Sequence, residues 1–299
     1  MRKPSKWLPG FIALGLVWGL SFLFVELALI SFSPIGIAFL RGLLGAVSLL
    51  VLVAVTRQKL PRVWRHWLHI SIVAVLLNAA PGFLFALGQE TVSSSIAGVI
   101  NATTPLMTVL IIISFFRDQT PTFDQFLGIV VGFFGILLVM EIFSSSNQAS
   151  VAGVITLLMA TLCYGLAMPY AKRFVSPLPY SPYVLAASQV SASAALTALP
   201  AILWGITHDV ITGTSLAGIA LLGVLGTGVA YVWNYRNIEL AGSVVASSVT
   251  YITPVVAVIA GVLVLGDQLS PSQVAGGILI VLSALLVQGR LRVTRTRNR

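Results

Sequence analysis

The feature that most constrains the fold of this 299-residue chain is a stretch that occurs twice. Residues 94–119 read SSIAGVINATTPLMTVLIIISFFRDQ, and 149 positions later residues 243–268 read SVVASSVTYITPVVAVIAGVLVLGDQ. The two copies align without a gap, and Thr104-Pro105 falls on Thr253-Pro254. Each copy is an apolar segment long enough to cross a bilayer, with a proline near its middle. The sequence therefore predicts a membrane protein built from two related halves.

Composition supports a membrane location. Apolar residues make up 58% of the chain and charged residues only 8%, and the mean hydropathy is +1.01. That is too little charge to cover a soluble domain, and apolar runs of about 20 residues require lipid around them. The run at residues 8–30 follows a basic N-terminus but is too long for the core of a secretory signal, so we expect it to be an uncleaved first span.

Ten spans are predicted from the apolar runs, which makes the fold class an all-α integral membrane protein. The expected ranges are 8–30, 34–55, 67–88, 92–115, 122–140, 151–171, 181–205, 213–235, 243–265 and 271–289. A polar, serine-rich stretch at 141–150 separates them into two sets of five. We therefore expect a first five-helix repeat at 1–140, a linker at 141–150, a second repeat at 151–289 and a basic tail at 290–299.

The positive charges predict the orientation. Sixteen of the 17 lysines and arginines lie in loops and tails on one side of a ten-span arrangement, and an excess of Lys and Arg is typical of cytoplasmic loops. Both termini are therefore expected in the cytoplasm. This placement also argues that the net charge of +9 reflects topology and not nucleic-acid binding. Five spans per half give the halves opposite orientations, which favours a site between them near the bilayer midplane.

Shorter motifs repeat as well. The WG pair at 18–19 has a counterpart in YG at 164–165, and FSP at 32–34 recurs as YSP at 180–182. With the proline-centred fourth span, these motifs make the chain resemble the EamA-type family of the drug/metabolite transporter superfamily over essentially its whole length. The resemblance implies a ten-span transporter of the inner (plasma) membrane that exports amino acids, other metabolites or drugs.

Two charged residues lie within the first two spans. Arg41 is seven residues past Pro34, about 10 Å from the outer end of its span, and Glu26 lies at a comparable depth. An intramembrane charge is costly and is usually paired or faces a cavity. Two interpretations stay open: a Glu26–Arg41 ion pair that fixes the hairpin, or an Arg41 that contacts a substrate carboxylate or gates the outer mouth. When the SP motifs are aligned, Arg41 falls on Gln189, so its role belongs to one half only.

Uncharged polar residues fall at matching places in the two halves; for example, Asn78 aligns with Thr227. Such side chains can simply join neighbouring helices, but a matched set near the midplane favours a shared cavity. The helix breaks expected at Pro105 and Pro254 free backbone carbonyls, which is tolerated only against protein or water. The residues expected to bind substrate are Trp18, Asn78, Asn101, Thr104, Tyr164, Thr227, Tyr231, Thr250 and Thr253.

The middle of the spans carries no carboxylate, which constrains the mechanism. A proton-driven pump for cationic drugs would use one, so we expect alternating-access transport of a neutral or zwitterionic solute, downhill or weakly coupled to protons. Amino acids are the leading class by resemblance, and a proton-coupled efflux pump is the alternative. An enzyme is disfavoured because no hydrolase elbow or metal site is evident. A channel is disfavoured because no filter repeat is present.

The expected partners are few. We expect no cofactor and no metal, a small-molecule substrate, and a monomer. The tail from Arg290 either holds anionic lipid at the inner face or serves orientation alone. Cys163 is the single cysteine, so an intrachain disulfide is excluded.

Overall fold

The computed structural model describes residues 7–115, 123–139, 150–241, 249, 252–287 and 291. Within these residues the regular elements are helices, and an isolated bridge joins Phe32 to Thr207. Six helical runs are long and apolar enough to cross a membrane, and three shorter apolar helices accompany them. The predicted all-α membrane class is confirmed.

The helices of the first half follow the predicted spans. Their bounds are α1 Leu8–Leu29, α2 Pro34–Val55, α3 Trp64–Ala74, η1 Val75–Ala79, α4 Ala80–Gln89, α5 Ser94–Asn101, α6 Thr104–Phe115 and α7 Phe123–Val139. Serine caps begin two of them. Ser33 accepts a hydrogen bond from the N–H of Gly36 at the start of α2, and Ser93 accepts one from Ile96 at the start of α5. These side chains satisfy N–H groups that the helix leaves without a partner.

The second half follows the same plan. Its helices are α8 Val151–Phe174, α9 Pro182–Trp204, α10 Gly213–Gly223, η2 Val224–Val229, α11 Ala230–Ala241, α13 Ile252–Ala260, η4 Gly261–Leu265 and α14 Pro271–Val287. The linker predicted at 141–150 lies outside the described residues except for Ser150, which caps α8. The predicted basic tail lies outside them except for Leu291, as does most of the stretch 243–251.

Within the described residues, four of the predicted spans depart from continuous α-helix. The break in the fourth was expected at Pro105, and in the ninth the π-helical segment η4 Gly261–Leu265 follows α13. The fourth breaks after Asn101 and resumes at Thr104, because Pro105 cannot donate to a preceding turn. The third and eighth each contain a π-helical segment, η1 at 75–79 and η2 at 224–229. These two segments start 149 residues apart, at equivalent positions of the repeat. Single-turn π segments often occur at functional sites.

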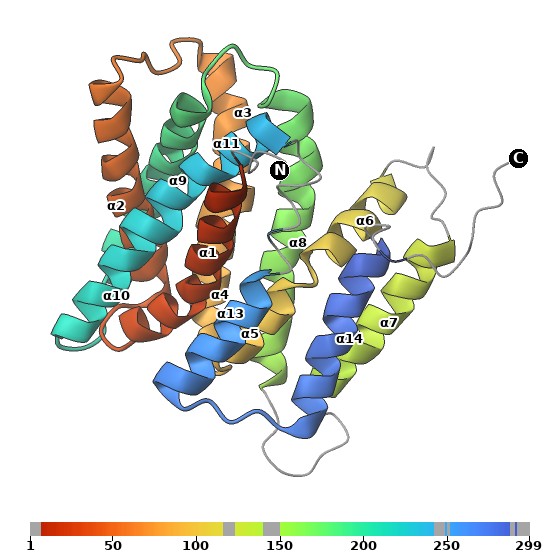
Figure 1. Cartoon of the computed structure of the whole chain (residues 1–299). Coiled ribbons are helices and arrows are strands. Elements are labelled where there is room, and N and C mark those ends of the chain that lie inside the picture. Colours follow the sequence, from red (N-terminus) through yellow and green to blue (C-terminus); the bar gives the residue numbers. More distant parts are fainter. Residues whose placement is uncertain are drawn as a thin grey trace, which may run out of the picture.

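The helices pack mainly between the halves and not within them (Figure 1). The strongest pairings join α7 to α14, α2 to α9, α4 to α8 and α1 to α10. Figure 1 shows α3 and its repeat counterpart α10 at opposite ends of the bundle. We call the end that contains the start of α3 the basic end, because Arg57, Lys59, Arg62 and Arg65 lie just before or within its first turn.

The repeated aromatic-glycine motifs explain how closely the halves approach. A Cβ on Gly19 would lie 2.9 Å from the carbonyl oxygen of Thr253, and a Cβ on Gly165 would lie 3.0 Å from the backbone of Met107 and Thr108. Both glycines therefore pass the proline-containing segment of the opposite half. Only a residue without a side chain allows this approach.

The α7–α14 contact also depends on glycine. A Cβ on Gly135 would lie 2.9 Å from the carbonyl oxygen of Gly276 and 3.1 Å from the backbone nitrogen of Ile280. Backbone atoms cannot move aside as a flexible side chain can, so even one methyl group forces the two helices apart.

We predict that Gly135→Ala lowers the stability of the protein by about 1–3 kcal/mol, the usual cost of overpacking a close contact. The midpoint of thermal unfolding in detergent is the measurement. Gly213→Ala is the matched control, because a Cβ at Gly213 would meet no atom within 4 Å. Equal midpoints for the two variants would contradict the close packing of α7 on α14.

Candidate functional site

A cavity of about 120 Å³, here called the central cavity, lies between the two halves. Its lining residues are Trp18, Ser21, Phe22, Val25, Arg41, Leu77, Phe85, Asn101, Thr104, Tyr164, Tyr231 and Thr253. They come from α1, α2, η1 and α4 to α6 of the first half, and from α8, α11 and α13 of the second. Most of the residues expected to bind substrate are therefore brought together here.

Aromatic rings form much of the wall. Trp18 meets Tyr231 edge to face with centroids 6.1 Å apart. Phe85 lies between Phe22, at 5.5 Å, and Tyr164, at 5.9 Å. Phe22 and Phe85 were not among the predicted residues, because a phenylalanine in an apolar span carries no signal that it faces a cavity.

Asn78 does not line the central cavity but lies directly behind it. Its Nδ2 donates to the hydroxyl of Tyr231 at 2.9 Å, and its Oδ1 accepts from Nε2 of Gln189 at 2.6 Å. The Tyr235 hydroxyl in turn donates to Oε1 of Gln189 at 3.0 Å. Asn78, Gln189 and Tyr231 are all buried. Asn78 thus positions the Tyr231 ring, which does line the cavity.

Thr227 also lies outside the lining, beside Arg41. The Nε of Arg41 donates to Oγ1 of Thr227 at 3.4 Å, and Thr227 is 1% exposed. Its hydroxyl donates to the carbonyl of Leu222, five residues earlier, as the π-helical geometry of η2 allows. Arg41, expected near the outer mouth, is therefore a lining residue whose guanidinium points to the opposite half.

The ion pair expected between Glu26 and Arg41 is not formed. The carboxylate of Glu26 accepts a hydrogen bond of 3.3 Å from Nε2 of Gln89, which also donates to the Phe22 carbonyl at 2.9 Å. Arg41 instead reaches Thr227. The expectation assumed that two helices joined by a short turn bring their charges together. Instead, Glu26 bonds to a residue of α4 and Arg41 bonds to a residue of η2.

The contacts of Arg41 and Asn78 are related by the repeat. Arg41 aligns with Gln189, and Thr227 aligns with Asn78. The Arg41–Thr227 and Gln189–Asn78 hydrogen bonds therefore occupy equivalent places, each joining a second-span position of one half to the π segment of the other. Both alignments were visible in the sequence, but nothing there indicated that the aligned residues touch.

At the break in the fourth span, threonine hydroxyls donate hydrogen bonds to nearby backbone carbonyls. The hydroxyl of Thr104 donates to the carbonyl of Asn101 at 2.8 Å, and the hydroxyl of Thr103 donates to the carbonyl of Ile100, also at 2.8 Å. Pro105 has no N–H for the Asn101 carbonyl, and the Thr104 hydroxyl takes its place; the Ile100 carbonyl also accepts from the N–H of Thr103 at 2.9 Å. Pro254 lies at the equivalent place in α13, whereas Thr250, another predicted lining residue, lies outside the described residues.

The two histidines near the start of the third span have protein partners. Nδ1 of His66 lies 2.7 Å from the Tyr180 hydroxyl, and Nδ1 of His69 lies 2.8 Å from the Tyr170 hydroxyl. The described part of the chain contains no group of three side chains that could hold a metal ion. These bonds tie the third span to the sixth span and to the loop that follows it.

Comparison with known proteins covers nearly the whole chain. The profile of the EamA-like transporter family matches residues 5–141 and 151–288. A solved crystal structure superposes with a TM-score of 0.66 at 20% identity, covering 96% of this chain and 99% of that one. At this identity the likeness supports the fold alone.

Several curated relatives are similar over almost their full length. The "Uncharacterized inner membrane transporter YedA" of Escherichia coli (strain K12) is 27% identical over 290 residues, 93% of this chain and 89% of the relative. An "Uncharacterized transporter" of Archaeoglobus fulgidus is 26% identical, covering 90% and 94%. "Protein PecM" of Dickeya dadantii is 23% identical, covering 91% and 89%.

We predict that Asn78→Ala destabilises the protein by about 1–3 kcal/mol, because Gln189 is left with a buried and unpaired amide donor. Thermal unfolding in detergent measures the effect. Thr56→Ala is the control, since it removes a hydrogen bond that is exposed, from the Thr56 hydroxyl to the Leu52 carbonyl. If both variants unfold at the wild-type temperature, the Asn78 network does not stabilise the fold.

Proposed function

Because the chain belongs to the EamA-like transporter family, we propose that it is a secondary or facilitative transporter that exports small amphipathic metabolites, with amino acids as the leading class. Family membership confirms the resemblance stated from the sequence, and it identifies a multi-pass membrane transporter and not an enzyme. In the proposal both termini are cytoplasmic. The two inverted halves rock about the central cavity, so that it opens to each side in turn.

The observation that carries the proposal is the chemistry of the central cavity. Arg41 supplies its positive charge, and as far as the structure describes the lining, Asp and Glu are absent from it. Asn101 and Thr104 add neutral polar groups beside the aromatic wall. An arginine attracts a carboxylate and repels a cation, so the cavity favours an acid or a zwitterion over a lipophilic cationic drug.

An amino acid fits each part of this lining. Its carboxylate would face the Arg41 guanidinium, and its apolar side chain would lie against Phe22 and Phe85. Its ammonium group would lie over the faces of Trp18 and Tyr231, where cation–π attraction replaces a carboxylate partner. The volume of about 120 Å³ also favours a small solute, because pockets for drug-sized ligands occupy roughly 300–1,000 Å³.

The helix interruptions support the proposed motion. The break at 102–103 and segment η1 border the central cavity, and η2 contacts its lining residue Arg41. Such places bend more easily than continuous helix. The Arg41–Thr227 and Gln189–Asn78 hydrogen bonds each join the two halves. In the proposal, opening toward one side loosens one of these bonds while its repeat counterpart persists.

A proton-coupled efflux pump is the second candidate, favoured by one observation. Glu26 lies within α1, and its described hydrogen-bond partner is the neutral amide of Gln89 instead of a cation. Ionisable side chains within membrane spans mark proton pathways in many pumps and transporters. Glu26 is therefore the residue on which the second candidate depends.

We predict amino-acid counterflow in proteoliposomes, in which preloaded unlabelled amino acid drives entry of labelled amino acid. Asn78→Ala and Thr227→Ala should lower the initial rate about tenfold, the equivalent of one lost hydrogen bond of 1.4 kcal/mol. Thr156→Ala, which removes an exposed hydrogen bond on α8, should leave the rate unchanged. Absence of flux for every amino acid would refute the substrate class but not the family. Equal rates in all variants would refute the role of the hydrogen bonds by which Asn78 and Thr227 hold Tyr231 and Arg41.

The same vesicles separate the two coupling mechanisms. We predict that an imposed pH gradient leaves the net flux of wild-type protein unchanged, because the central cavity presents no described carboxylate to carry a proton. If the gradient instead accelerates flux and Glu26→Gln abolishes only that acceleration, the proton-coupled candidate is correct. Glu90→Gln, at the end of α4, is the matched control.

A further inference from the structure

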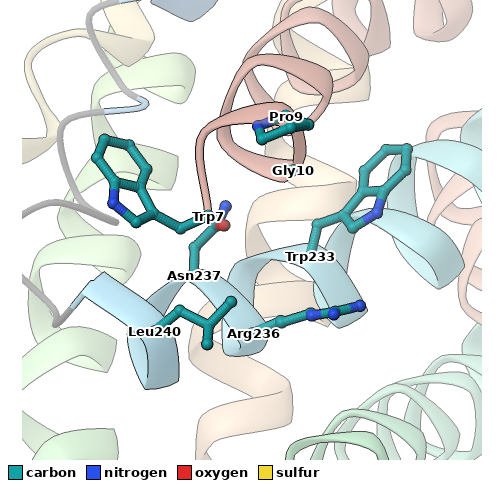
Figure 2. A pocket seen from close by; sticks show the side chains of 7 residues that line it. All are labelled: Trp7, Pro9, Gly10, Trp233, Arg236, Asn237 and Leu240. Carbon is teal, nitrogen blue, oxygen red and sulfur yellow. The ribbon is translucent and has the colours of Figure 1, made fainter. Parts of the chain in front are cut away.

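A second cavity, of about 230 Å³, lies between the first turn of α1 and helix α11 (Figure 2). We call it the α1–α11 cavity. Its lining residues are Trp7, Pro9, Gly10, Trp233, Arg236, Asn237 and Leu240. It shares none of them with the central cavity.

The start of α1 is a positive helix end that the described side chains do not neutralise. Trp7 occupies the capping position and makes no side-chain cap, Pro9 has no N–H, and the first turn contains no acidic residue. The N–H groups of a first turn have no intrahelical acceptor, and the helix dipole adds positive potential there. A helix end of this kind favours an anion.

Asn237 supplies an independent sign of a missing partner. It is 1% exposed, and its Nδ2 has no hydrogen-bond partner in the described structure. A Cβ on Gly10 would lie 3.4 Å from its Oδ1, so the amide lies against the first turn of α1. Figure 2 shows the amide reaching from α11 toward Trp7 and Gly10. Buried amide donors are costly when unpaired, so an acceptor from outside the chain accounts for this one.

The remaining lining residues define the chemistry of that acceptor. Arg236 is exposed beside Asn237 and offers a guanidinium that binds phosphate oxygens in a bidentate manner. Trp7 and Trp233 flank the cavity (Figure 2), and tryptophan is enriched where headgroups meet water. Leu240 is 44% exposed and extends the rim as an apolar surface.

We propose that the α1–α11 cavity binds the phosphate of an anionic phospholipid, with phosphatidylglycerol as the simplest example. The first turn of α1, the Asn237 amide and the Arg236 guanidinium donate to the phosphate oxygens. The two tryptophans and Leu240 contact the glycerol and the upper acyl chains. A free phosphate would leave these three apolar side chains uncovered. Because α1 and α11 belong to different halves, the lipid joins the two halves at the end of the bundle where α1 begins.

The test is a titration of the full-length protein, delipidated in neutral detergent, with short-chain phosphatidylglycerol, counting bound lipids by native mass spectrometry. Wild type should bind one molecule saturably, and Arg236→Gln and Asn237→Leu should each weaken binding about tenfold. Arg236 is exposed, and Asn237→Leu removes an unpaired amide, so both variants should fold. Arg173→Gln is the matched control, because the exposed Arg173 lies over the Phe174 ring and outside the cavity.

Two further ligands identify the source of the phosphate. Phosphatidylcholine with the same chains should bind at least about tenfold more weakly, since its choline opposes Arg236, and inorganic phosphate should not displace phosphatidylglycerol. Displacement by inorganic phosphate at similar concentrations would overturn the lipid assignment in favour of a soluble anion. Unchanged binding in Arg236→Gln and Asn237→Leu, or an equal loss in Arg173→Gln, would overturn the site itself.

Discussion

The structure depends on one constraint of the bilayer: a polar group inside it must find its partner within the protein or at a wet surface. Helix interruptions create such groups, and here they occur at equivalent places of the two halves. The π segments η1 and η2 carry Asn78 and Thr227, which bond to Gln189 and Arg41 of the opposite half. Each half therefore supplies the partners that the other half lacks, and the two pack into one body.

The same constraint explains where the central cavity lies. The fourth-span break, the close contact of Gly19 with Thr253 and polar side chains of both halves lie together at the central cavity. Asn78 holds Tyr231 in the wall, and Thr104 covers the Asn101 carbonyl while lining the cavity. Features that stabilise the broken helices thus also shape the cavity, so a substitution that weakens one is expected to disturb the other.

The two cavities differ in the kind of anionic group that their arginine and its surroundings favour. Arg41 lies among aromatic rings between the halves, which fits a small solute with a carboxylate. Arg236 lies beside an uncapped helix start and an unpaired amide, which fits a phosphate. Both cavities lie between the halves, so in the proposed mechanism bound lipid and bound solute act on the same interface.

The sequence by itself determined the membrane class, the repeat, nearly all span boundaries and the position of the fourth-span break, because apolar run length, residue offset and proline chemistry are properties of the chain alone. It also indicated six of the twelve lining residues, through polar and aromatic residues at matched positions. Only the tertiary structure decided the contacts. Glu26 bonds to Gln89 and not Arg41, Asn78 lies behind the cavity, and Phe22 and Phe85 face it. Such contacts depend on the rotation and depth of each helix against its neighbours, which packing between the halves decides.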